Sequence, residues 1–189
     1  MFKPQLKFQK ILFLGALILS AVCFFYSLGI MTDLYGLYQT KAMGGVTGSD
    51  LFYDMQDYNH YLVIGALGLI VISCLPFIFA SNKRRKYYRG NVICTYIQAV
   101  AFVAWAVYVI INNINYRSQF VNGVDFVSWK SLADLFAFTY SESTFFFDAG
   151  FVMAVLCIAC AVAIIYNLNW KNKLVKEEDM ILKGEKENA

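Results

Sequence analysis

Five cysteines are the residues of this 189-residue chain best suited to chemistry, and Cys157 and Cys160 form a C-x-x-C motif. In redox-active motifs of this kind a lowered pKa makes one thiol nucleophilic. All five cysteines lie in long apolar segments without a basic neighbour, where the neutral thiol is favoured. We therefore expect them to be packing residues, at positions 23, 74, 94, 157 and 160.

Candidate metal ligands are few. His60 is the only histidine, which excludes a bis-histidine haem and a multi-histidine zinc site. Asp50, Asp54 and Asp57 share one face of a predicted helix, but one face cannot surround a hard cation with six or more oxygens. We expect no metal, and interpret the three aspartates as a solvated acidic face or a contact for a basic partner.

Signatures of catalysis are also absent. The chain contains no G-x-x-x-x-G-K-[ST], G-x-S-x-G, H-E-x-x-H or G-x-G-x-x-G motif. No catalytic residue and no cofactor is predicted, and the chain is interpreted as a non-enzyme.

The elements that hold these residues are predicted by charge-free windows. The chain is 59% hydrophobic and only 15% charged, whereas soluble domains average about 25% charged residues. About 20 apolar residues in a helix cross a hydrocarbon core of about 30 Å. The windows predict an all-α integral membrane protein, a four-transmembrane-helix bundle with two long outer loops. Its expected spans are residues 11–32, 58–82, 90–114 and 148–169.

Basic residues predict the orientation. Thirteen Lys and Arg residues lie in segment 1–10, link 83–89 and tail 171–189, against three in the two outer loops. Because basic residues are retained in the cytoplasm, both termini are predicted to be cytoplasmic. We expect a single four-span membrane domain over 1–170 and a charged cytoplasmic tail over 171–189. The basic charge reflects topology, so no nucleic acid partner is expected.

The outer loops contain the aromatic residues expected to contact a partner. A helix is predicted to start near Asp50, and a short amphipathic helix in the second loop has Ser128 as a possible cap. This second helix could lie on the membrane, cover the ends of the spans or bind a partner. The candidate contacts are Phe52, Tyr53, Tyr58, Trp129, Leu132, Phe136 and Tyr140.

Small and polar residues within the spans suggest how helices associate. Gly150 with Ala154, and Ala159 with Ala163, form small-x-x-x-small pairs that allow close packing within the chain or with another one. Polar groups in the third span, Gln98, Asn112 and Asn113, could bond to other helices or line a polar path. The basic link 83–89 is interpreted as a topological anchor, with anionic-lipid binding as the alternative.

Resemblances to known families are limited. The C-x-x-C pair resembles that of four-helix thiol oxidoreductases of the vitamin K epoxide reductase family, which implies redox activity in a membrane. That family carries the pair at the outer end of a span, whereas Cys157 lies nine residues beyond Asp148, and the outer loops contain no shuttle cysteine. Tetraspanins and claudins share the four-span plan, but their loop cysteine signatures are absent.

These patterns favour a non-catalytic accessory or structural subunit of a larger membrane complex, such as a transporter. A homo-oligomeric channel or facilitator for a small solute is the alternative, and a membrane thiol oxidoreductase is the minor one. The expected partners are the lipid bilayer and another membrane protein or a second copy. Residue usage rich in Lys, Asn, Ile and Phe indicates a bacterial cell membrane protein.

Overall fold

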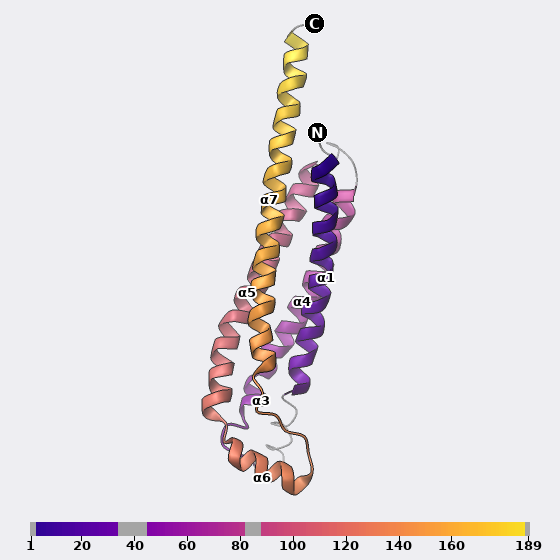
Figure 1. Ribbon diagram of the computed structural model, residues 1–189. Helices are drawn as coiled ribbons and strands as arrows, with labels where there is room; N and C mark the ends of the chain where they lie inside the picture. Colours follow the sequence, from indigo (N-terminus) through magenta and orange to yellow (C-terminus); the bar gives the residue numbers. More distant parts are fainter. Residues whose placement is uncertain (1–2, 34–44, 82–87, 188–189) are drawn as a thin grey trace.

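The structure of the protein, a computed structural model, describes residues 3–33, 45–81 and 88–187 (Figure 1). Four of its helices are long and apolar enough to cross a membrane. The prediction of four helices of spanning length is therefore confirmed. The elements are α1 Lys3–Asp33, α3 Leu51–Asp54, α4 Gln56–Ser81, α5 Tyr88–Gly123, α6 Phe126–Phe136 and α7 Phe145–Glu187.

Three of the long helices continue well beyond the charge-free windows that predicted them. Helix α1 begins at Lys3, α5 runs to Gly123, and α7 runs to Glu187. Lys, Arg and Glu are good helix formers, so a charged residue marks the edge of an apolar window without ending the helix. At about 1.5 Å per residue, the 43 residues of α7 extend about 65 Å, roughly twice the thickness of a hydrocarbon core.

The long helices form a bundle in which α1 packs against α4, α4 against α5, α5 against α7, and α7 against α1. Figure 1 shows both termini at one end of this bundle, which we call the terminal end. Helices α3 and α6 lie at the opposite end, the loop end. At the terminal end α7 extends farther than α1.

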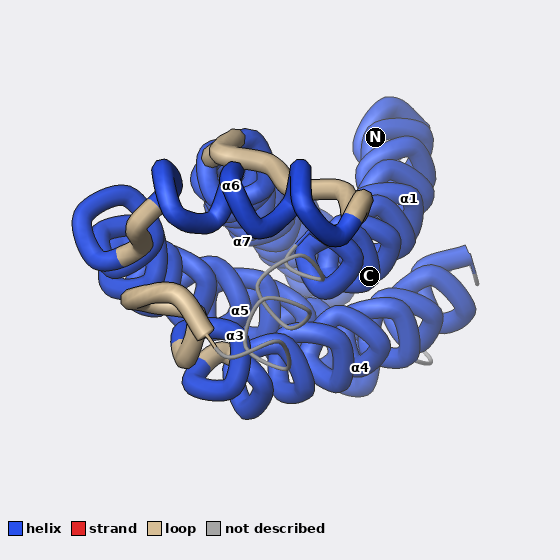
Figure 2. Tube along the Cα trace, turned by 90° about the horizontal axis from the view of Figure 1, so that it is seen from below, coloured by secondary structure: helices blue, strands red, loops and turns tan. Residues whose placement is uncertain are grey.

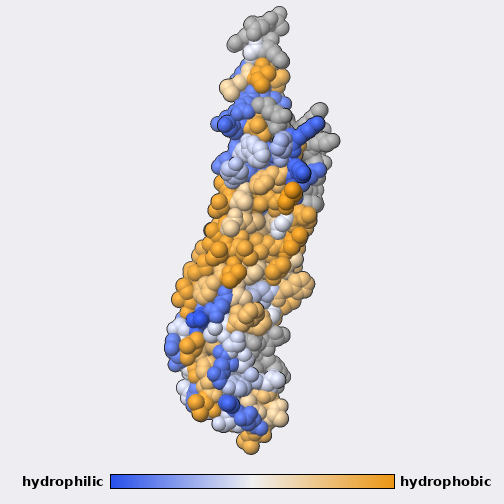
Figure 3. Space-filling model, viewed as in Figure 1, coloured by the Kyte–Doolittle hydropathy of each residue, from blue (hydrophilic) through white to orange (hydrophobic). Residues whose placement is uncertain are grey.

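The bundle exposes apolar side chains and buries polar ones. Exposed residues include Ile18 on α1, Val71 on α4 and Val155 on α7, each more than half exposed, whereas Ser73 and Gln98 are fully buried. On the face shown in Figure 3, the exposed apolar residues form a broad belt across the middle of the molecule. Monomeric soluble proteins rarely expose so continuous an apolar surface, and polar contacts between helices are typical of membrane bundles.

At the loop end, the two segments that connect the long helices contact each other. The Asp125 backbone N–H donates to the Thr47 carbonyl at 3.0 Å. Gly48, with a φ of +85°, lies so close to the backbone of Gly123 and Val124 that a Cβ there would overlap it. Helix α6 then runs across the ends of the long helices (Figure 2). Helix α6 thus covers the end of the bundle, which is one of the three positions considered for this amphipathic helix.

Candidate functional site

The predicted acidic face lies at the start of the second long segment. Helix α3 begins at Leu51, and the helix is interrupted at Met55 before α4 starts at Gln56. Asp50, Asp54 and Asp57 are all exposed. The Asp50 side chain makes no capping hydrogen bond to α3. Within residues 3–33, 45–81 and 88–187, no group of three His, Cys, Asp or Glu residues is placed to hold a metal ion.

The predicted partner contacts fall into three classes by exposure. Tyr58 and Trp129 are 2% and 1% exposed, so both side chains contact this chain's own residues. Tyr53 and Phe136 are about half exposed. The remaining three are partly buried: Phe52, Leu132 and Tyr140.

Trp129 attaches α6 to the rest of the loop end. Its ring stacks on Phe126 with a centroid distance of 5.6 Å and meets Tyr140 edge-on at 5.2 Å. Phe120, at the end of α5, contacts both Trp129 and Phe147 of α7, at 6.4 and 5.6 Å. Aromatic pairs of this kind stabilise a fold by more than the buried area of the rings alone accounts for. Trp129 is therefore a structural residue that joins α6 to α5, and Phe120 in turn joins α5 to α7.

Both ends of α6 have defined caps. The Asp125 carboxylate accepts hydrogen bonds from the Ser128 backbone N–H at 3.2 Å and from the Ser128 hydroxyl at 2.6 Å. These bonds lower the pKa of Asp125 below its usual value. Asp125, and not the predicted Ser128, is thus the N-cap, as the spacing D-x-x-S could have indicated. At the other end Ala137 adopts a left-handed conformation with a φ of 52°.

The outward face of α6 bears apolar side chains that were not among the predicted partner contacts. Val127 is 79% exposed and Leu135, eight residues later, is 73% exposed. Phe136, one of the predicted partner contacts, is half exposed but shares a side of α6 with buried Trp129 and Ala133, and the helix ends there. We call Val127 and Leu135 the outward face of α6.

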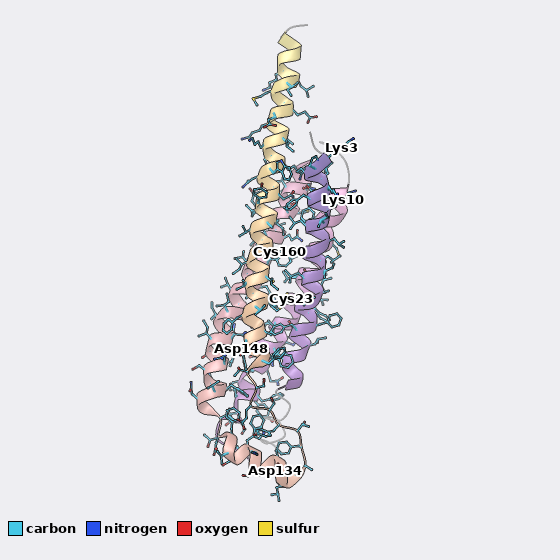
Figure 4. The ribbon with its side chains drawn as sticks, in the orientation of Figure 1. Lys3, Lys10, Cys23, Asp134, Asp148 and Cys160 are labelled. Atoms are coloured by element: carbon cyan, nitrogen blue, oxygen red, sulfur yellow. The ribbon has the colours of Figure 1, made fainter. Side chains whose placement is uncertain are left out.

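Charged residues show where this face lies relative to the apolar belt. The Arg117 Nε donates to Asp148 at 2.8 Å, and both side chains remain substantially exposed. Figure 4 shows Asp148 on the loop-end side of Cys23 and Cys160. Charged groups avoid hydrocarbon, and α5 continues six residues past Arg117, about 9 Å. The outward face of α6 therefore lies beyond the belt and not against it.

A hydrogen-bonded cluster joins three helices below the loop end. The Tyr58 hydroxyl of α4 donates to Asn113 Oδ1 of α5 at 2.8 Å, and Asn113 Nδ2 donates to the Phe147 carbonyl of α7 at 2.8 Å. Gly150 makes this approach possible, because a Cβ at that position would overlap the Asn113 amide and the Tyr26 hydroxyl. Asn113, proposed from sequence as an interhelical or path-lining group, is here an interhelical contact.

The predicted small-residue pairs separate into two environments. Gly150 and Ala154 are buried and pack within the bundle of this chain. Ala159 is exposed on the outside of α7, and Ala163 is partly buried. Only the first pair therefore serves close packing between the described helices.

Two further groups of buried polar residues lie along the bundle. In the middle, the Gln98 amide donates to Ser73 Oγ at 3.2 Å, and Ser73 lies 3.0 Å from Ser20 Oγ. Toward the terminal end, Gln5 Nε2 of α1 donates to Asn167 Oδ1 of α7 at 3.0 Å. These contacts join α1 to α4, α4 to α5, and α1 to α7. Gln98 is thus paired across helices, while Asn112 bonds only to the Tyr108 carbonyl of its own helix.

The cysteines take an arrangement that the C-x-x-C spacing did not predict. Cys157 Sγ lies 3.6 Å from Cys23 Sγ of α1, and both side chains are fully buried. All five cysteines are free thiols. The contact between α1 and α7 could not be read from sequence, because the two residues are 134 positions apart.

Most of the predicted basic link, residues 83–87, lies outside the described residues. The tail is described to residue 187, and it continues α7 without interruption. Comparison with protein-family models, with curated proteins and with solved structures finds no match to this chain.

Proposed function

We propose that this chain is a non-catalytic accessory or structural subunit of a larger membrane complex, such as a transporter. The observation that carries the proposal is the outward face of α6, where Val127 and Leu135 are exposed on a folded helix beyond the apolar belt. Apolar anchors within a polar rim are typical of protein interfaces. Because α6 is capped at both ends and held by Trp129, little ordering would be required on binding.

The charge around this face favours a protein partner over lipid. Acidic residues predominate among the described residues of the loop end, and the exposed apolar residues Val127 and Leu135 lie on the side of α6 away from buried Trp129 and Ala133. A helix that rested on the membrane would direct its most exposed apolar residues toward the belt. The loop-end acids are Asp50, Asp54, Asp57, Asp125, Asp134, Glu142 and Asp148, against Arg117 and Lys130.

A homo-oligomeric channel or facilitator is the second candidate. The polar groups at three levels of the bundle, Gln5, Gln98 and Asn113, favour it because they could line a path if helices separated. In the single chain, however, all three are fully buried and hydrogen-bonded between helices. A thiol oxidoreductase has less support, because Cys157 is buried against Cys23 and the apolar stretches that contain them, residues 11–32 and 149–170, have no Lys or Arg.

The proposal includes a location in the cell membrane of a bacterium, with the terminal end in the cytoplasm. The orientation is supported by the distribution of basic residues, and the bacterial origin by residue usage rich in Lys, Asn, Ile and Phe. A cysteine introduced at Gly123 should react with a membrane-impermeant thiol reagent in intact cells, and one at Asn172 should not. Labelling at Asn172 and not at Gly123 would reverse this orientation.

Partner contact can be tested by gentle detergent extraction from native membranes. The double variant Val127→Ser with Leu135→Ser should lose the proteins that co-purify with the parent chain, while its expression and membrane insertion stay near normal. Both positions are exposed, so the substitutions leave the packing of Trp129 intact.

The matched control replaces two exposed apolar residues at the other end, Met180→Ser with Leu182→Ser. This control should retain the partner. The proposal is wrong if both double variants and the parent purify as the same partner-free homo-oligomer that conducts solute in liposomes, which would favour the channel.

A further inference from the structure

Three aromatic rings join α1 and α7 near the terminal end of the apolar belt. Phe8 contacts Tyr166 and Trp170 with centroid distances of 6.5 and 6.1 Å, and the latter two rings are 6.5 Å apart. Tyr166 is 63% exposed, and the other two rings are partly exposed. Tyr and Trp favour the interface between hydrocarbon and headgroups, since each combines an apolar ring with a polar group, and Phe8 packs against both. We call Phe8, Tyr166 and Trp170 the aromatic triad.

Lysines accompany the triad on both helices. Lys173 lies seven residues after Tyr166 and three after Trp170, so the three share one stripe of α7. On α1, Lys7 directly precedes Phe8 on the side of the N-terminus. Lys7 and Lys173 are exposed, and neither forms an ion pair with any residue that the structure describes.

The surrounding charge is favourable for an anion. Lysines outnumber acids among the described side chains of the terminal end, and Glu177 continues the stripe of Lys173 one turn farther from the belt. The lysines are Lys3, Lys7, Lys10, Lys171, Lys173, Lys176 and Lys183, and the acids are Glu177, Glu178 and Asp179.

The two helices are fixed relative to each other at this level. Gln5 Nε2 donates to Asn167 Oδ1 at 3.0 Å and to Gln9 Oε1 at 2.8 Å, and all three side chains are almost fully buried. The rings and lysines on α1 and α7 therefore keep a constant spacing, which a defined binding site requires.

We propose that the aromatic triad, with Lys7 and Lys173, is a binding site for an anionic phospholipid. The acyl chains lie against the rings, and the two lysines bind the headgroup phosphate from opposite sides of the α1 and α7 contact. The inference is independent of the function proposed for α6, because it rests on the opposite end of the molecule. Each lysine near an anionic headgroup should favour binding about fivefold.

The test measures quenching of tryptophan fluorescence by brominated lipids in vesicles that contain the full chain. Trp105 and Trp129 are buried, so quenching by lipid reports mainly on Trp170. In phosphatidylcholine vesicles, a fixed fraction of brominated phosphatidylglycerol should quench the emission more than the same fraction of brominated phosphatidylcholine. Trp170→Phe should remove the difference and identify its source.

Two double variants then separate a site from general attraction. Lys7→Gln with Lys173→Gln should abolish the preference for phosphatidylglycerol. Lys10→Gln with Lys183→Gln removes the same charge and should retain most of it. Figure 4 shows Lys10 on the side of α1 away from α7, and Lys183 lies ten residues beyond Lys173.

Three outcomes would overturn the proposal. One is equal quenching by the two lipids. Another is an equal loss of preference in both double variants, which would indicate only a diffuse basic surface. A third is loss of the preference on addition of inorganic phosphate, which would indicate an anion site without lipid specificity.

Discussion

At the loop end the aromatic rings pack against one another inside the protein, whereas at the terminal end they lie on its outer surface. Trp129 and Trp170 occur in similar local sequence, and each is followed by a lysine, Lys130 or Lys171. The two tryptophans differ in burial because the helices that contain them take different directions. Helix α6 turns across the bundle and buries Trp129, while α7 continues straight outward and leaves Trp170 partly exposed. The role of an aromatic residue in this protein therefore follows from tertiary structure and not from its neighbours in sequence.

The two ends also differ in charge. Acids surround the folded loop end, and lysines predominate on the terminal end. A rigid, acidic surface with exposed apolar residues suits a protein partner, and a basic, ring-lined surface suits anionic lipid. We therefore propose different contacts for the two ends: a protein at the loop end, where the rings build the fold, and lipid at the terminal end, where they lie on the surface.

The largest expected difference between the two ends concerns their tryptophans. Trp129→Ala removes a buried ring and should lower the free energy of unfolding by about 3–5 kcal/mol. Trp170→Ala should lower it by less than about 1 kcal/mol, because its ring is partly exposed. Denaturant titration in detergent micelles, followed by circular dichroism, measures both. Equal losses of unfolding free energy in the two variants would show that the two tryptophans stabilise the fold to the same extent, contrary to this comparison.

The next effect concerns close packing below the loop end. Gly150→Ala forces a Cβ against the Asn113 amide and the Tyr26 hydroxyl, and should destabilise the bundle by about 1–3 kcal/mol. Gly15→Ala, which meets no atom within 4 Å, should be neutral or stabilise by up to about 1 kcal/mol. The same unfolding titration compares them, and a harmless Gly150→Ala would show that the cluster packs more loosely.

A smaller effect is expected where α6 ends. Ala137 has a φ of 52°, a conformation that glycine adopts without the steric penalty of a Cβ. Ala137→Gly should therefore stabilise the protein by about 1 kcal/mol. Thr139→Gly, in the same loop but without a positive φ, should not stabilise it. Thermal unfolding of the two variants provides the comparison.

The smallest effect is a pH dependence of the loop-end cap. The two hydrogen bonds from Ser128 hold the pKa of Asp125 below its ordinary value of 3.8. The ionised Asp125 carboxylate therefore contributes to the free energy of unfolding. This contribution is fully present above pH 3.8 and is lost as the pH falls through the lower pKa of the folded state. Hydrogen exchange of the α6 backbone amides can be measured in the parent and in Asp125→Asn at the same pH. The ratio of the parent's exchange rate to the variant's should be higher in acid than at neutral pH, because only the parent loses a carboxylate.

An unchanged ratio would mean that the carboxylate of Asp125 does not stabilise the cap. The terminal end provides an internal reference in the same samples, since amides of α7 beyond Trp170 should show no dependence on this substitution.

Much of the fold could be predicted because charge is excluded from hydrocarbon, so windows such as 11–32 indicate helices of spanning length. The residues at which α5 and α7 end could not be predicted, because Lys, Arg and Glu continue a helix readily. The burial of Trp129 and the meeting of Cys23 with Cys157 depend on how distant helices pack. The outward face of α6 was missed for the same reason, since Val127 and Leu135 become exposed only when the opposite stripe covers the bundle.

The central claim, that the outward face of α6 contacts a protein, is tested most directly by photo-crosslinking in intact native membranes. A photoreactive phenylalanine analogue at Leu135 should form an adduct with another membrane protein, while the same analogue at Val71, in the apolar belt, should react mainly with lipid. Adducts of Leu135 with lipid alone, or only with a second copy of this chain, would contradict the account.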